Sequence, residues 1–245
     1  MVEVTVLPLL IFAAAILDSS VGHAGASGYL TAMALCGVAP EAMKPAALTL
    51  KVLVATIAAV SFYRAGCFSL SLFWPFAASS EPFAFLGGLL TLPGYVYKPV
   101  VGGVLLFAAA GLIRSPRRDA APPATRPVPL LAALWSGAGI GLLSGLTGTG
   151  GGIFLGPLLM FMGWAETRES AGASAAFNLV NSLAGLAGLF AGFAVRPAAV
   201  PLWAVAAVAD GLIGSWLGSR RLGGRTLRRL LAAVLVIAGL KLMLT

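Results

Sequence analysis

The sequence has very little charge. Only 10% of its 245 residues are Asp, Glu, Lys or Arg, whereas a soluble domain carries about 25%. Hydrophobic residues make up 59% of the chain, and apolar runs such as 4–17, 100–113 and 230–244 recur along almost its whole length. Because about 20 apolar residues in a helix span a bilayer, the composition excludes an ordinary soluble domain. It predicts an all-α, polytopic integral membrane protein.

Histidine and cysteine are also scarce. The one histidine is His23, and the two cysteines lie in or beside apolar segments. They indicate neither a disulfide framework nor the spacing of metal ligands, so we expect no metal and no cofactor. The stretch "GASG" at 25–28 matches the G-x-S-G pattern of rhomboid-like intramembrane proteases, but Ser27 lacks the histidine on another helix that would act as its base. We therefore expect that the protein is not an enzyme.

Acidic residues are half as numerous as basic ones, with 8 Asp and Glu against 16 Lys and Arg. Nine of the sixteen cations lie in two short stretches, four within 114–127 and five within 219–229. Short basic loops between apolar segments are the positive-inside signal of cytoplasmic loops. The excess charge thus indicates contact with anionic membrane lipids and not with nucleic acid.

The chain divides into two similar halves, 1–113 and 128–245, joined by the basic cytoplasmic linker 114–127. A shift of 126 residues aligns 21–66 with 147–192 without gaps and matches 10 of 46 positions, with glycine pairs at both ends. Such self-similarity predicts two homologous repeats with about 8–10 transmembrane segments in total. The ten apolar segments are 4–18, 26–38, 46–63, 69–91, 96–113, 128–143, 151–163, 171–193, 199–218 and 227–244.

The loops 92–99 and 219–226 occupy corresponding places in the halves but differ in charge. The first has one Lys and no Arg, and the second has three Arg. Corresponding loops on opposite sides of the membrane are the mark of an inverted-topology repeat, which is the arrangement that we expect. If the short segments beside the glycines merge with their neighbours, each half has four crossings and the repeats become parallel.

Glycine crowds into 145–152, "GLTGTGGG", and a first-half counterpart lies at 21–28. Glycine favours irregular backbone, which lipid tolerates only where it is buried in protein or lines a cavity. The apolar segment 153–163 is too short to span alone, so we expect a half-helix whose N–H groups and dipole can bind an anion. Close helix packing is the alternative, and it is all that the glycines of "GLAGLFAG" at 185–192 require.

The motif "GTGGGI" followed by "PLL" and the small-residue stretch "AGASAAFN" resembles the TauE/SafE family of sulfite-exporter-like permeases. The resemblance covers about 140–195, with a weaker copy at 18–66, and places family glycines at Gly150, Gly151 and Gly152 and the motif proline at Pro157. It implies a permease for sulfite, organosulfonates or related anions in a bacterial-type cytoplasmic (inner) membrane. The first half departs from the motif, reading "HAGASG" with Thr31 opposite Pro157.

Polar residues inside apolar segments are costly and are candidates for function. Lys51 can neutralise a substrate anion or can extend its ammonium to the membrane interface. His23 can have a structural role or can contact substrate or a proton, and Asp18, Glu81 and Asp210 can couple transport to protons or form ion pairs. The remaining candidate substrate-binding residues are Gly25, Ser27, Thr147, Thr149, Gly150, Gly151, Gly152 and Asn178.

The sequence therefore predicts a transporter that binds a small anion near the membrane midplane, between two glycine-rich helix breaks. A passive anion channel or facilitator would use the same breaks, and a permease for small carboxylates would use the same charge. A scaffold subunit without transport would have little use for Lys51 and for paired glycine breaks. The transported anion, the direction of transport, the coupling ion and a homo-oligomeric state stay open.

Overall fold

The computed structural model describes residue 12 and residues 26–114, 126–192, 200–220 and 225–244. In these ranges every regular element is an α-helix, as the composition predicts. The helices are α2 (Ala26–Leu35), α3 (Pro40–Arg64), α4 (Leu70–Leu89), α5 (Gly94–Arg114), α6 (Leu130–Thr147), α7 (Gly152–Phe161), α8 (Thr167–Ala191), α9 (Val200–Arg220) and α10 (Arg225–Leu244). The first apolar segment, 4–18, lies outside the described residues.

Helix lengths repeat between the two halves. The second helix of each half, α2 and α7, has 10 residues, and the third, α3 and α8, has 25. Gly37 and Gly163, which the 126-residue shift aligns, follow the two short helices with positive φ angles of 72° and 66°. The shift found in the sequence therefore carries over to local structure.

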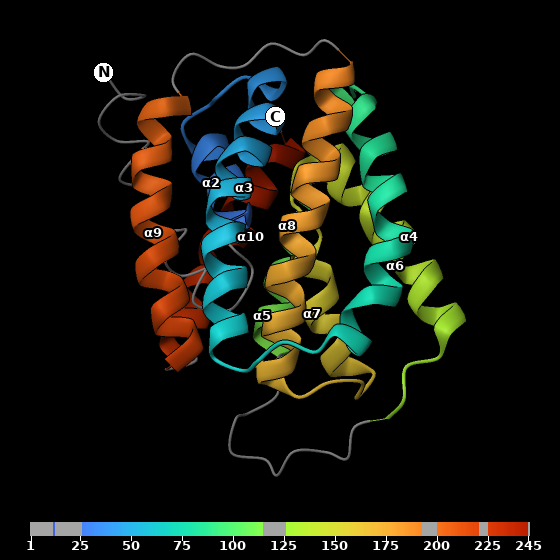
Figure 1. Cartoon of the computed structure of the whole chain (residues 1–245). Helices are drawn as coiled ribbons and strands as arrows, with labels where there is room; N and C mark the ends of the chain where they lie inside the picture. Colours follow the sequence, from blue (N-terminus) through green and yellow to red (C-terminus); the bar gives the residue numbers. More distant parts are fainter. Residues whose placement is uncertain (1–11, 13–25, 115–125, 193–199, 221–224, 245) are drawn as a thin grey trace.

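Corresponding helices run in opposite directions in Figure 1. There α3 descends from its first residue while α8 ascends, and α4 ascends while α9 descends. An inverted repeat would place them in this way. The orientation of the two halves in a membrane stays a prediction.

Helices α4, α6 and α8 pack closely through small residues. A Cβ on Gly145 of α6 would lie 2.8 Å from the backbone nitrogen of Gly88 and closer still to the carbonyl oxygen of Ala84. A Cβ on Gly188 of α8 would lie 3.0 Å from the nitrogen of Leu89 and would collide with the carbonyl of Phe85. Backbones approach so closely only where the side chain is hydrogen, so Gly188 in the 185–192 stretch does serve packing.

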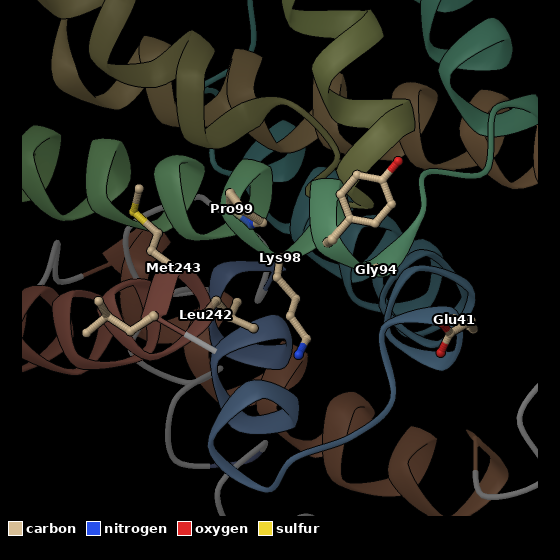
Figure 2. A pocket seen from close by; sticks show the side chains of 8 residues that line it. Glu41, Gly94, Lys98, Pro99, Leu242 and Met243 are labelled. Carbon is tan, nitrogen blue, oxygen red and sulfur yellow. The ribbon is translucent and has the colours of Figure 1, made fainter.

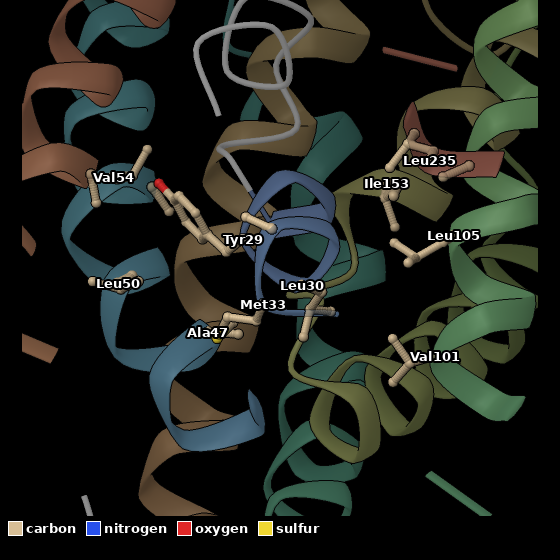
Figure 3. Packing of buried hydrophobic residues seen from close by; sticks show 14 of the residues in the cluster. Tyr29, Leu30, Met33, Ala47, Leu50, Val54, Val101, Leu105, Ile153 and Leu235 are labelled. Atoms are coloured by element: carbon tan, nitrogen blue, oxygen red, sulfur yellow. The ribbon is translucent and has the colours of Figure 1, made fainter. Parts of the chain in front are cut away.

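A large apolar core surrounds the short helix α2. Tyr29, Leu30 and Met33 of α2 are completely buried, and they face side chains from α3, α5, α7 and α10 (Figure 3). The short helix α2 thus packs into the interior of the bundle, and the first residues of α7, Gly152 and Ile153, are buried there as well.

Four of the described helical segments are long and apolar enough to cross a membrane, namely Glu41–Arg64, Gly94–Gly111, Leu130–Thr147 and Arg168–Ala191. The apolar helix α7 has only 10 residues, which at 1.5 Å per residue is about half of the hydrocarbon thickness. It is therefore a half-helix, as its sequence predicts, and its beginning lies within the bundle.

Candidate functional site

The glycine-rich stretch of the second half breaks the helix as predicted. Helix α6 ends at Thr147 and α7 begins at Gly152, and we call residues 147–152 the second-half break. Gly148, Gly150 and Gly151 have φ angles of 82°, 74° and 83°. Other residues adopt this left-handed region only at a cost, so the run of glycines is needed here for backbone geometry.

Lys51 of α3 meets the second-half break. Its side chain is completely buried, so the ammonium does not reach the outer surface of the described part of the protein. A Cβ on Gly150 would lie 2.8 Å from Lys51 Cδ, and its nearest neighbours would be Cε and Nζ. The ammonium therefore lies directly against the backbone of Gly150, and only a glycine leaves room for it.

Helix α8 supplies the other wall of the break. Asn178 is completely buried, and its Oδ1 accepts a hydrogen bond of 2.7 Å from the backbone N–H of Gly152. The ring of the neighbouring residue, Phe177, packs against Gly151 of the break, since a Cβ on Gly151 would lie 2.7 Å from Phe177 Cε1. Asn178 thus satisfies the first N–H of α7, where the helix dipole is positive.

Two threonines line the beginning of the break. Thr147 and Thr149 are both completely buried, and their hydroxyl oxygens lie 2.9 Å apart. Thr147 Oγ1 also donates to the carbonyl of Leu143 at 2.6 Å. The Tyr97 hydroxyl of α5 donates to the carbonyl of Thr147 at 3.0 Å, so a third long helix holds the end of α6.

Buried polar side chains continue along one side of α8. Ser170, Ser174, Asn178 and Ser182 recur every fourth residue, and each is at most 1% exposed. Residues four apart are neighbours on one helix face. The hydroxyls of Ser174 and Ser182 have no hydrogen-bond partner among the described residues. An unpaired buried hydroxyl is unfavourable, so this face is suited to a polar ligand or water.

A second buried lysine, Lys44, was not predicted from the sequence. Its side chain is 6% exposed, and its ammonium donates to the carbonyls of Gly87, Gly88 and Leu90 at 2.9, 2.9 and 2.8 Å. It therefore caps the C-terminus of α4, where unpaired carbonyls and the helix dipole favour a cation. Its sequence signal was weak because Lys44 lies in the first turns of α3, where a lysine can equally face water.

The other predicted site residues belong to other segments of the chain, and the structure describes only some of them. Asp18, His23 and Gly25 lie outside the described residues, together with most of the first-half break. Ser27 lies in the first turn of α2, and Asp210 lies in α9. Glu81 lies in α4 and is exposed. Of the predicted residues, the structure therefore gathers Lys51, Asn178 and those of the second-half break.

The described part of the chain is an all-helical bundle with several membrane-length apolar helices, an interrupted helix and a polar centre. Interrupted helices around a buried polar centre are typical of membrane transporters. The class of protein that the fold and the site define is thus a multi-pass membrane transporter.

Comparison with known proteins agrees with this class. The family model "Sulfite exporter TauE/SafE" matches residues 7–242, and the chain belongs to this family. It is 42% identical over 239 residues to "Probable membrane transporter protein y4hK" of Sinorhizobium fredii (strain NBRC 101917 / NGR234), with 97% of each chain covered. No solved structure matches the chain. The protein is accordingly a membrane transporter, and the family match extends well beyond the two motif regions found in the sequence.

Proposed function

We propose that the protein is a permease of a bacterial-type cytoplasmic membrane that moves a small sulfur-containing anion, such as sulfite or an organosulfonate. The substrate class rests on the name of the family model, "Sulfite exporter TauE/SafE". The anionic character of the ligand has independent support in the cationic side chain at the second-half break.

The observation that carries the proposal is the position of Lys51. A buried ammonium is costly, and within the membrane such a residue marks a substrate or ion path by default. Lys51 is completely buried against Gly150, at a break where the backbone is irregular and where a half-helix begins. An anion bound here would gain the attraction of the ammonium and of the positive end of α7.

The polar walls of the break suit an oxyanion. Thr149 is completely buried, and Ser174, one turn before Asn178, is buried without a partner among the described residues. The Gly152 N–H is engaged by Asn178 Oδ1, so an anion that uses this N–H must displace the asparagine oxygen. Asn178 then would turn its amide N–H toward the anion. In this scheme Asn178 occupies the anion position when the site is empty.

The mechanism that we propose is alternating access between two inverted repeats, with the site between them. A rocking motion of one half against the other would expose the second-half break to each side of the membrane in turn. In the scheme both Arg-rich regions face the cytoplasm. Reporter fusions at 92–99 and 219–226 test this topology, and reporters on the same side would exclude the inverted arrangement.

The proposal is tested with the purified protein in proteoliposomes and in detergent. Uptake and thermal stabilisation are measured with sulfite, thiosulfate, a short organosulfonate, acetate and chloride, since a ligand that binds the folded state raises its stability. Lys51→Gln should weaken binding of the preferred anion by about 10- to 150-fold, because a hydrogen bond to a charged group contributes about 1.5–3 kcal/mol.

The matched control is Lys241→Gln. Lys241 donates to the Leu35 carbonyl at 3.0 Å, so the substitution removes a cation at the C-terminus of α2. It should leave anion affinity unchanged. If the Lys51→Gln variant and the unaltered protein bind the anion with equal affinity, Lys51 is not part of the site. If the protein prefers acetate, the proposed substrate is a carboxylate and not a sulfur-containing anion. In a transporter, unlabelled anion on the opposite side of the membrane should accelerate tracer uptake by exchange. Absence of this acceleration would favour a passive channel.

A further inference from the structure

A pocket of about 510 Å³ opens at one end of the bundle. It lies where α3 and α5 begin and where α10 ends, and Figure 2 shows Lys98 extending across it between Glu41 and the last turn of α10. Its wall combines these two charged side chains with Tyr95, which is 80% exposed, and with the apolar Met243 and Leu244. The pocket is thus open to solvent, charged and large enough for a small ligand.

One face of α3 leads from this pocket to the second-half break. Glu41 is exposed and lines the pocket, Lys44 is 6% exposed, and Lys51 is completely buried. Lys44 and Lys51 are seven residues apart and lie on the same side of the helix. At 1.5 Å per residue, Glu41 and Lys51 are about 15 Å apart along the axis. Lys44 therefore lies between the pocket and the site in depth.

Helix α5 makes a second connection between the same two places. Lys98 lines the pocket, while its neighbour Tyr97 is 3% exposed and donates to the Thr147 carbonyl, where the break begins. Lys44 also borders the break, since a Cβ on Gly148 would lie 3.3 Å from the carbonyl oxygen of Lys44. Tyr97 and Lys44 thus each contact the break from a helix that also lines the pocket, and we call this pair the Tyr97–Lys44 layer.

We propose that this pocket is an entry site for the transported small anion and that the Tyr97–Lys44 layer closes it from the central site. The inference rests on the proposed function, because it assigns a route to that site. Lys98 attracts the anion at the mouth, and Lys51 binds it at the centre. Glu41 is a like charge at the mouth, and it lies in the first turn of α3, where the positive end of the helix dipole offsets part of its repulsion.

The apolar part of the wall also suits the headgroup region of a phospholipid, with the phosphate on Lys98. The helices α3 and α5 that line the pocket also contact the break through Lys44 and Tyr97, and this shared wall favours the anion route. The two occupants differ in what happens to transport when the pocket is blocked, and the experiment is built on this difference.

The test uses Lys98→Cys in the full chain with Cys36 and Cys67 replaced by alanine. A membrane-impermeant, bulky maleimide is attached as a stable thioether, the excess reagent is removed, and sulfite uptake into proteoliposomes is then measured. We expect the attached group to lower uptake at least fivefold, and the labelling reaction to be slower at saturating concentrations of a short organosulfonate, which does not consume the reagent as sulfite does. Thr91→Cys is the matched control, because Thr91 is exposed in the short loop before α5 and does not line the pocket. Its modification should leave uptake unchanged.

The layer is tested separately by the modification rate of Thr149→Cys. Tyr97→Phe removes the hydrogen bond to the Thr147 carbonyl and should raise that rate severalfold, whereas Tyr95→Phe on the same helix should not. An equal rate in both backgrounds would overturn the closing role of the layer.

The outcomes of these experiments separate the two proposals. Full modification of the Lys98→Cys variant without loss of uptake would overturn the entry site and leave the permease proposal intact. A second outcome would also overturn the entry site: the protein co-purifies with a phospholipid, and Lys98→Gln removes that lipid without changing uptake. This result would identify a lipid site. An unmodified protein that transports none of the tested sulfur anions would overturn the proposed function, and the entry site with it.

Discussion

Substitution of Gly150 by alanine tests the contact on which the central site depends. Gly150 has a φ of +74°, and a Cβ there would lie 2.8 Å from Lys51 Cδ and nearer to Cε and Nζ. Because carbon atoms pack at about 3.5–4.0 Å, the end of the lysine has to retreat by about 1 Å. The substitution should therefore disturb both the backbone of the break and the position of the ammonium.

The two effects have different magnitudes and different readouts. Left-handed backbone costs a non-glycine residue about 1–2 kcal/mol, which should lower the free energy of unfolding by that amount. At an effective dielectric constant of about 20, a unit anion about 4 Å from the ammonium gains about 4 kcal/mol, and at about 5 Å it gains about 3.3 kcal/mol. The difference of about 0.7–0.8 kcal/mol corresponds to a dissociation constant about fourfold larger, that is, to weaker binding of the anion.

Gly163→Ala is the matched control. Gly163 has a φ of +66°, and no atom lies within 4 Å of an added Cβ. This variant should therefore lose about 1–2 kcal/mol of stability for the same dihedral reason and keep the affinity of the unaltered protein. Stability is measured by denaturant unfolding in detergent and affinity by thermal stabilisation with the preferred anion. Equal anion affinity of the two variants would refute the assignment of Lys51 and Gly150 to the site.

Three further predictions concern stability and use the same unfolding assay. Asn178→Ala removes the acceptor of the first N–H of α7 and should cost about 1 kcal/mol, as loss of a helix cap does, whereas Asn178→Asp keeps an acceptor oxygen and should recover most of it. Lys44→Met removes the donor of three carbonyls at the end of α4 and should cost about 1.5–3 kcal/mol; an unchanged unfolding midpoint would contradict its capping role. Gly145→Ala would push its Cβ into the backbone of α4 and should cost about 1–3 kcal/mol or more, while Gly139→Ala on the same helix, with no atom within 4 Å, should be neutral or slightly stabilising.

Helix positions were well predicted from the sequence, because hydrophobic length and glycine have local consequences. The apolar segment 151–163 became the 10-residue helix α7, and the 126-residue shift placed α2 and α7 in register. The left-handed glycines at the second-half break follow from the same local rule, since three consecutive glycines exceed what packing needs.

The role of single polar residues was less predictable. Lys51 could have extended to the interface or pointed to the centre, and sequence spacing was compatible with both. Glu81 has a place in its half similar to that of Asp210, but Glu81 is exposed on α4. The capping role of Lys44 could not be read from the sequence, because its three carbonyl acceptors come from residues more than 40 positions away.

The sequence by itself determined the membrane class, the two similar halves and the broken helix, because each depends on composition or on backbone preferences within a few residues. Only the tertiary structure decided that Lys51 lies against Gly150, that Asn178 holds the beginning of α7, and that Tyr97 and Lys44 contact the break from α5 and α3. These contacts join α3, α4, α5, α6, α7 and α8, which approach one another through glycines on several helices. Side-chain direction and helix separation are set by that packing, and no local pattern in the chain encodes them.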